Sequence, residues 1–572
     1  MPGASRSELA GRRAVPVSVS VPVPARSLRP RVRFAPVLRK HSPREPPLAI
    51  SGLESSFRRY AAPKIAKDGT PAGRAVRVLA SPPGCGSGRW GTIEEARCDL
   101  VRLLSSCSVH GDVLRYRELV VSGSIDRAIL HLGAPAALSA LLQAGFLIVD
   151  AFWLGRVGPA AVAAASTAGF AMWLAQTIGE GAAAGSGSVL AAAVGSGDRA
   201  AVERATAAGQ SLGLWGSLIV VGFGLWLVRP LFEFMGTDPA VTHSGTAYLV
   251  IVLLGMPSYF LFSWISAAFR AAGYAGTALR LLAVAAAVNV VLDPLLIFGV
   301  GPLPRLGVAG AASATVLAWT IGCARGWQLL GRLGIRPRPL AFLRPPAESW
   351  AALRVGLPLA VEGALFSLIY VLLTRVTTTF GTPAVAALGI GHKLEVLNYF
   401  VCAGMGAAAT TLVGQNLGAG DAVRASRTAW RALFLTILPV GLVTMVLVSR
   451  PAAAVSVFIS DHEVVSAGVT YVLLVGLSQV FMAAEVVLVG AFAGSQWTTI
   501  PAAIEIALTA ARVPMAAWLV GRGWGVEAVW LAIAATCVIK GTVLALLFAF
   551  RRPRLATGRG ILGGLPYNAP GP

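Results

Sequence analysis

Long blocks of uncharged residues follow one another through most of this 572-residue chain. From about Ala128 onward, stretches of roughly 20 to 28 residues contain few or no charged side chains, which is enough for a helix to cross a bilayer. Only 13% of the residues are charged and the mean hydropathy is +0.70, whereas about a quarter of a soluble globular chain is charged. The apolar residues do not alternate with polar ones, so the sequence predicts an all-α polytopic membrane protein.

The apolar blocks predict twelve transmembrane helices. Their approximate limits are 128–152, 161–193, 206–228, 246–268, 278–299, 308–330, 352–379, 384–416, 429–449, 466–490, 498–520 and 526–550. Arginines are concentrated in alternate loops, as at Arg199 and Arg204, and in the segment from Arg325 to Arg354. Because basic loops stay on the cytoplasmic side, both termini are expected in the cytoplasm.

An internal repeat divides the chain into two halves. A shift of 223 residues superposes Gly133 and Pro135 on Gly356 and Pro358, and the same register holds across four predicted helices. Each half has an even number of helices, so the two six-helix lobes enter the membrane from the same side and are pseudo-symmetric. The predicted organisation is a basic, disordered extension (1–125), a first lobe (126–332), a cytoplasmic linker (333–350), a second lobe (351–551) and a cytoplasmic tail (552–572).

The extension carries much of the formal net charge of +22. Residues 1–130 contain 22 Arg or Lys and 10 Asp or Glu. An organelle transit peptide is one interpretation of this Arg-rich segment, and a disordered extension is the one we favour. We expect no nucleic-acid partner, because basic residues beside membrane helices are explained by topology. The six cysteines form no C-x-x-C pair, and neither a disulfide framework nor a metal site is predicted.

Several motifs resemble those of the multidrug and toxic compound extrusion (MATE) transporters. The segment 413–421, which reads VGQNLGAGD, closely resembles the V-G-Q-x-x-G-A-G hallmark of that family, and 193–198 is a weaker copy. Segment 149–155 looks like the end of the family's first helix, and 289–312 like its fifth and sixth helices. The resemblance covers about residues 128–551 and is greatest to the DNA-damage-inducible protein F (DinF) branch. It implies a secondary transporter with no cofactor except a coupling ion, H⁺ or Na⁺.

Ionisable groups inside membrane helices are costly, so each is a candidate for function. Asn289 and Asp293 lie one turn apart on the fifth predicted helix, and Asp150 ends the first, with Gln143 two turns earlier. Two carboxylates in one apolar pocket cannot both be ionised at low cost, so the pair would hold a proton or a cation. The resemblance implies the same cation site for these four residues, with Tyr248 as the nearby tyrosine. Alternatively, Asp293 caps a helix before Pro294 and Asp150 faces outer water.

The second lobe offers fewer candidates. Glu362 follows Pro358 by four residues, and the family often carries acids on this helix; Glu395 is a second candidate that could instead pair with Arg375. Asp150 has Leu373 as its counterpart, and Asp293 aligns near Arg512, which favours one main cation site in the first lobe. Pro135 can kink the first helix, and in the family this bending has been linked to protonation.

Together these features predict a monomeric antiporter, not an enzyme, that exports cationic or amphipathic organic compounds in exchange for H⁺ or Na⁺. The expected location is a bacterial plasma membrane, with a eukaryotic organelle membrane as the alternative. A flippase for lipid-linked saccharides is the second possibility, although it would need a more basic cavity. An integral-membrane lipid enzyme is the third, although it would need a cluster of His, Asp or Cys at the membrane face.

Overall fold

The computed structural model describes residues 112–235, 239–299, 304–335 and 345–556. Most of the predicted extension and tail, and half of the predicted linker, lie outside these ranges. The first half contains α2 (Arg117–Val121), α3 (Ile125–Val157), α4 (Pro159–Ser196), α5 (Arg199–Met235), α6 (Pro239–Leu254), α7 (Met256–Ala271), α8 (Ala275–Phe298) and α9 (Val308–Arg332). The second half contains α11 (Glu348–Thr377), η2 (Thr378–Phe380), α12 (Thr382–Gly418), α13 (Ala422–Ser449), α14 (Pro451–Ser456), α15 (His462–Gly494), α16 (Thr499–Ala510), α17 (Arg512–Gly521) and α18 (Glu527–Ala556).

Within the described residues, eleven helices are long and apolar enough to cross a membrane, or twelve if one bent pair is counted as a span. The bent pair is α6 and α7, which meet at Gly255 at an angle of 49°. Pro257 lies in the first turn of α7, where its missing N–H is tolerated. The expectation of twelve membrane helices is therefore confirmed, with the fourth helix broken near its middle.

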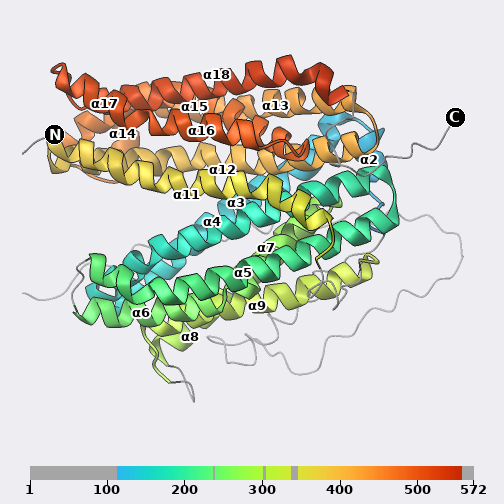
Figure 1. Ribbon diagram of the computed structural model, residues 1–572. Helices are drawn as coiled ribbons and strands as arrows, with labels where there is room; N and C mark the ends of the chain where they lie inside the picture. The colour runs from blue at the N-terminus through green and yellow to red at the C-terminus, as the bar shows by residue number, and fades with distance from the viewer. Residues whose placement is uncertain (1–111, 236–238, 300–303, 336–344, 557–572) are drawn as a thin grey trace, which may run out of the picture. The chain divides into compact units, whose positions relative to one another are not determined.

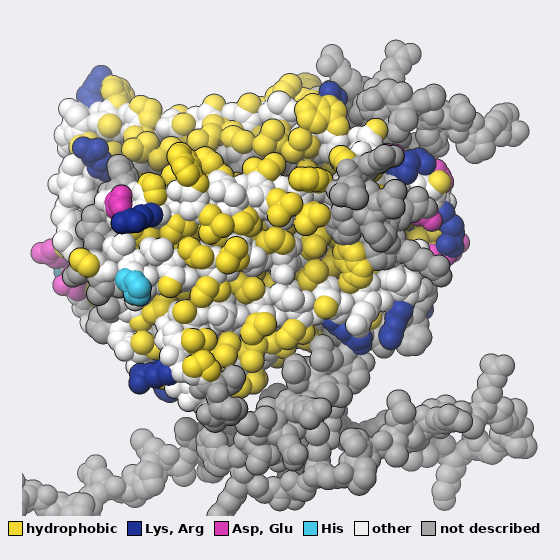
Figure 2. Space-filling model, turned by 60° about the horizontal axis from the view of Figure 1, so that its bottom comes forward, with side chains coloured by type: hydrophobic (Ala, Val, Ile, Leu, Met, Phe, Trp, Pro, Cys, Tyr) yellow, Lys and Arg dark blue, Asp and Glu magenta, His cyan; other side chains and the backbone are white. Residues whose placement is uncertain are grey.

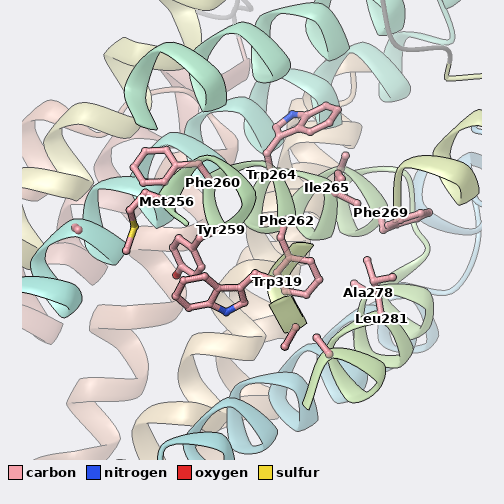
Figure 3. Packing of buried hydrophobic residues seen from close by; sticks show 14 of the residues in the cluster. Met256, Tyr259, Phe260, Phe262, Trp264, Ile265, Phe269, Ala278, Leu281 and Trp319 are labelled. Atoms are coloured by element: carbon pink, nitrogen blue, oxygen red, sulfur yellow. The ribbon is translucent and has the colours of Figure 1, made fainter. Parts of the chain in front are cut away.

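The two halves of the chain form two helical bundles (Figure 1). Separate hydrophobic clusters fill them: one spans residues 113–352, and two are built mainly from α12 to α18. In the first bundle α7 itself carries many of the large buried side chains, and its Tyr259 ring lies 4.8 Å from the Trp319 ring of α9 (Figure 3). Figure 2 shows a broad apolar band on one face, with charged side chains gathered at its two ends. This distribution is the one expected of a surface that contacts lipid.

The bundles touch closely at the C-terminal ends of α4 and α12. A Cβ on Gly195 would collide with the Gln415 backbone, and one on Gly418 with the Ala192 backbone, so glycine permits this approach. The Gln415 side chain also donates a hydrogen bond of 2.6 Å to the Ala271 carbonyl across the interface. This is the end that carries the basic loops, so the two halves are closed on the cytoplasmic side.

Exposure changes along the same two helices. Residues 189–194 of α4 and 411–418 of α12 are buried, whereas Trp173 and Ile178 on α4 and Leu397 and Tyr399 on α12 are exposed. The helices therefore leave their tight contact as they run toward the other side of the membrane.

Residues 112–124, which the sequence assigns to the disordered extension, are instead packed against both halves. The Arg117 side chain donates a 2.9 Å hydrogen bond to the Gly195 carbonyl, which belongs to the first half. On the other half, Arg424 donates to the Val120 carbonyl at 3.1 Å. Val120 itself is buried in a cluster of the second half. Residues 112–124 therefore pack with the helices of both halves, and these contacts were not visible in the sequence.

Candidate cation site

A buried polar cluster joins α3, α8 and α9 in the first half. Asn289 and Asp293 are fully buried on one face of α8, as their spacing predicted. The Asn289 amide donates to the Asp293 carboxylate at 3.1 Å and lies 3.3 Å from the Thr315 hydroxyl on α9. Asp150 on α3 interacts with the side chains of all three. The structure thus brings together Asp150, Asn289 and Asp293, which are 143 residues apart at most.

Three oxygen atoms of this cluster lack a hydrogen-bond partner among the described residues. They are Oδ1 of Asp150, Oδ1 of Asn289 and Oδ2 of Asp293. No described Lys or Arg forms an ion pair with either carboxylate. Buried polar atoms are almost always partnered, so three unpaired oxygens in one place require an explanation. A bound proton would satisfy one carboxylate, and a small hard cation would be coordinated by all three oxygens.

The other residues predicted for this site lie at different distances from the cluster. Tyr248 on α6 is buried and close enough to interact electrostatically with both carboxylates, but its hydroxyl points to the Met172 sulfur at 3.8 Å. Gln143 is exposed and does not join the cluster. Pro135 lies inside α3, which continues without a break from Ile125 to Val157.

Thr315 was missed by the sequence reasoning. It is buried, and its hydroxyl lies beside Asn289, but a single threonine in an apolar helix carries no distinguishing signal. Only the pairing of α8 with α9 places it in the cluster.

The second half has a different arrangement at the related positions. Tyr471, the repeat counterpart of Tyr248, donates a 2.9 Å hydrogen bond to Glu395. Arg512 is buried and donates to Tyr370 and to Thr536, each at 2.8 Å. Arg375, which the sequence suggested as a partner for Glu395, is exposed. The buried cation near Glu395 is therefore Arg512, and the repeat alignment of Arg512 with Asp293 was the signal that could have identified it.

Glu362 lies beside a second buried group of charges. Lys540 on α18 forms ion pairs with Glu485 on α15 and with Glu505 on α16, the latter at 3.0 Å. Glu362 interacts electrostatically with Glu485 and Lys540. The carboxylates of the second half are thus associated with a cation that the chain itself supplies.

Glu180 on α4 is an exposed carboxylate held by two hydroxyls. Tyr259 donates to it at 2.8 Å and Ser263 at 3.2 Å. Tyr399 on α12 of the other half lies near enough to interact with Glu180 electrostatically.

Both halves of the chain match one family model. The model is MatE, and it matches residues 135–295 and again residues 358–518. The chain belongs to the MatE family. The two matches follow the internal repeat.

Two bacterial relatives and one solved structure are among the proteins that this chain resembles. The chain is 28% identical over 442 residues to the probable multidrug resistance protein NorM of Thermotoga maritima, which covers 74% of this chain and 92% of the relative. It is 27% identical over 360 residues to the FAD transporter of Shewanella oneidensis, covering 61% and 78%. A multidrug resistance MATE transporter solved in an outward-facing conformation superposes with a TM-score of 0.72 at 21% identity, covering 77% of this chain and 98% of that one.

These similarities make this MatE protein a multi-pass membrane transporter and not an enzyme. Its named relatives are consistent with a bacterial plasma membrane.

Proposed function

We propose that this MatE protein is an antiporter that exports cationic or amphipathic organic compounds, driven by inward movement of H⁺ or Na⁺ through the Asp150–Asn289–Asp293 cluster. The observation that carries the proposal is the set of three buried oxygens without partners. A coupling ion that binds and leaves in each cycle needs ligands that the resting protein does not permanently satisfy.

The first lobe is favoured because the buried carboxylates of the second lobe lie beside a cation that the chain itself supplies. There, Glu485 and Glu505 are already paired with Lys540. Arg512 lies near the repeat counterpart of Asp293, and its positive charge would repel an entering cation. The combination of Asp150 with an Asn-x3-Asp helix also supports placing the chain in the DinF-like branch.

The coupling cycle follows from the contacts between the halves. With the cytoplasmic ends of α4 and α12 closed, ions enter from outside and bind Asp150 and Asp293. Asp150 lies on α3, and α3 also packs against the second half, since a Cβ on Gly404 of α12 would meet the backbone at Ala137. Ion binding that shifts α3 would therefore alter the contact between the halves, which is the motion that alternating access requires.

A cationic cargo is supported by Glu180 of the first half, an exposed carboxylate that accepts hydrogen bonds from two hydroxyls. A flippase for lipid-linked saccharides would instead need a basic surface between the halves.

The test is ethidium efflux from proteoliposomes under an imposed proton gradient or an imposed Na⁺ gradient. Export that one gradient drives, and that Asp293→Asn abolishes, supports the proposal and identifies the ion. Glu233→Gln is the matched control, because Glu233 is an exposed acid that pairs only with Arg229 on the surface. Coupled export that persists in Asp293→Asn would contradict the proposed site, and absence of efflux under both gradients would contradict the proposed substrate class.

A further inference from the structure

A basic hollow lies beside the first turns of α13, away from the cation site. It measures about 310 Å³ and is lined by Ile125 of α3 and by Ser426, Arg427, Trp430 and Arg431 of α13. We propose that this hollow binds the phosphate-bearing headgroup of an anionic phospholipid in the cytoplasmic leaflet.

The charge of the hollow is only partly neutralised by the protein. Arg424, on the preceding turn, is engaged by the carbonyls of Val120 and Gly123. Arg431 Nε lies 3.6 Å from Asp126 Oδ1. Arg427, in contrast, has no polar partner within the part of the chain that the structure describes. Its guanidinium presents donors in the planar geometry that suits a phosphate group.

A buried hydroxyl adds a second, independent indication of a ligand. Ser426 is 1% exposed, and its Oγ has no hydrogen-bond partner among the described residues. Helical serines usually satisfy this hydroxyl with a carbonyl of the preceding turn. An unpaired hydroxyl on the wall of a basic hollow would instead donate to a phosphate oxygen.

The internal repeat shows that this position takes an anion in the other lobe. Arg204 is the counterpart of Arg427 under the 223-residue shift, and its Nε lies 2.7 Å from a Glu348 oxygen. The counterpart of Ser426 is Glu203, itself an acid. Arg204 is thus paired with a carboxylate that the chain supplies from α11, whereas Arg427 has no such partner among the described residues, so an anion from outside the chain fits the hollow.

The surface below the hollow favours a lipid over free phosphate. Phe434, Leu438 and Leu442 follow Trp430 at four-residue intervals on α13 and are 55%, 57% and 58% exposed. They form one apolar stripe along a helix that can span the membrane. A headgroup in the hollow would place its acyl chain along this stripe, and a tryptophan at the boundary is typical of the membrane interface.

Native mass spectrometry of the purified full-length chain tests the proposal, with phosphatidylglycerol and phosphatidylcholine as probes. We expect phosphatidylglycerol to be retained in preference, and Arg427→Gln to weaken its retention about fivefold, since one basic residue contributes about 1 kcal/mol near an anionic surface. Ser426→Ala should also weaken it, although this change removes no hydrogen bond within the described protein. Arg332→Gln is the matched control, because Arg332 is an exposed arginine near the cytoplasmic end of α9.

Three results would overturn the proposal. The first is equal retention of the two lipids by the unaltered chain. The second is equal weakening by Arg427→Gln and Arg332→Gln. The third is displacement of phosphatidylglycerol by millimolar inorganic phosphate, which would assign the hollow to free phosphate and not to a lipid. Reduced retention in both Arg427→Gln and Ser426→Ala, with phosphate having no effect, would support it.

Discussion

The Tyr471 hydroxyl donates a 2.9 Å hydrogen bond to the Glu395 carboxylate inside the second lobe. Their repeat counterparts, Tyr248 and Met172, make the corresponding contact in the first lobe at 3.8 Å, with a sulfur in place of the carboxylate. The two lobes therefore keep one geometry with different chemistry. In the second lobe this tyrosine stabilises a half-buried acid, whereas in the first it is a neighbour of the cation cluster.

Tyr471→Phe should destabilise the protein more than Tyr248→Phe does. The first change leaves the half-buried Glu395 carboxylate without its donor, at a cost of about 1–3 kcal/mol, whereas a thioether is only a weak acceptor. Thermal unfolding of both variants in the same detergent measures the difference. Equal losses of stability would show that the hydrogen bond to Glu395 is not the stabilising contact.

Thr315→Val should weaken binding of the coupling cation about fivefold, because it removes one hydrogen bond of about 1 kcal/mol at the Asn289 amide while conserving volume. The half-saturating ion concentration for efflux is the measurement. Thr320→Val on the same helix is the control, since Thr320 is exposed and bonds to Ser258 and not to the cluster. The prediction fails if the two variants behave alike.

Much of the fold could be predicted, because membrane helices can be recognised from amino-acid composition alone. All twelve predicted spans lie on described helices, since runs of uncharged residues of sufficient length have few other structures available. The break at Gly255 was not predicted. Pro257, in the first turn of α7, is the local signal that marks it, and this proline was not used in the prediction.

The candidate site was predictable in part for a similar reason. Asn289 and Asp293 are four residues apart, so helical periodicity places them on one face, and this spacing can be read directly from the sequence. Asp150 was predicted as a site residue because an acid inside a membrane helix is costly and because the family resemblance implies it. Thr315 and the pairing of Lys540 with Glu505 required the tertiary contacts between helices, and Gln143, which periodicity places on the face of Asp150, is exposed in the structure.

Lys540→Met should be strongly destabilising, by about 3–5 kcal/mol, because it leaves Glu485 and Glu505 buried without a cation. Adding Glu505→Gln should recover part of the loss, since one of the uncompensated charges is then removed. The measurement is unfolding of the single and double variants in detergent. If the double variant were no more stable than Lys540→Met, the pairing at 3.0 Å would not be the source of the stability.

Gly195→Ala should slow transport by opposing the closed cytoplasmic contact. The added methyl group would collide with the Gln415 backbone, so α4 and α12 could no longer approach as closely, and the equilibrium would shift away from the state in which these ends meet. Gly441→Ala is a matched control: nothing lies within 4 Å of a Cβ there, and alanine is favoured over glycine inside a helix by about 1 kcal/mol. Efflux rates and spin-label distances between the ends of α4 and α12 would measure both effects. A longer distance and slower efflux in Gly195→Ala alone are expected, whereas an unchanged distance would mean that closure does not depend on this glycine contact.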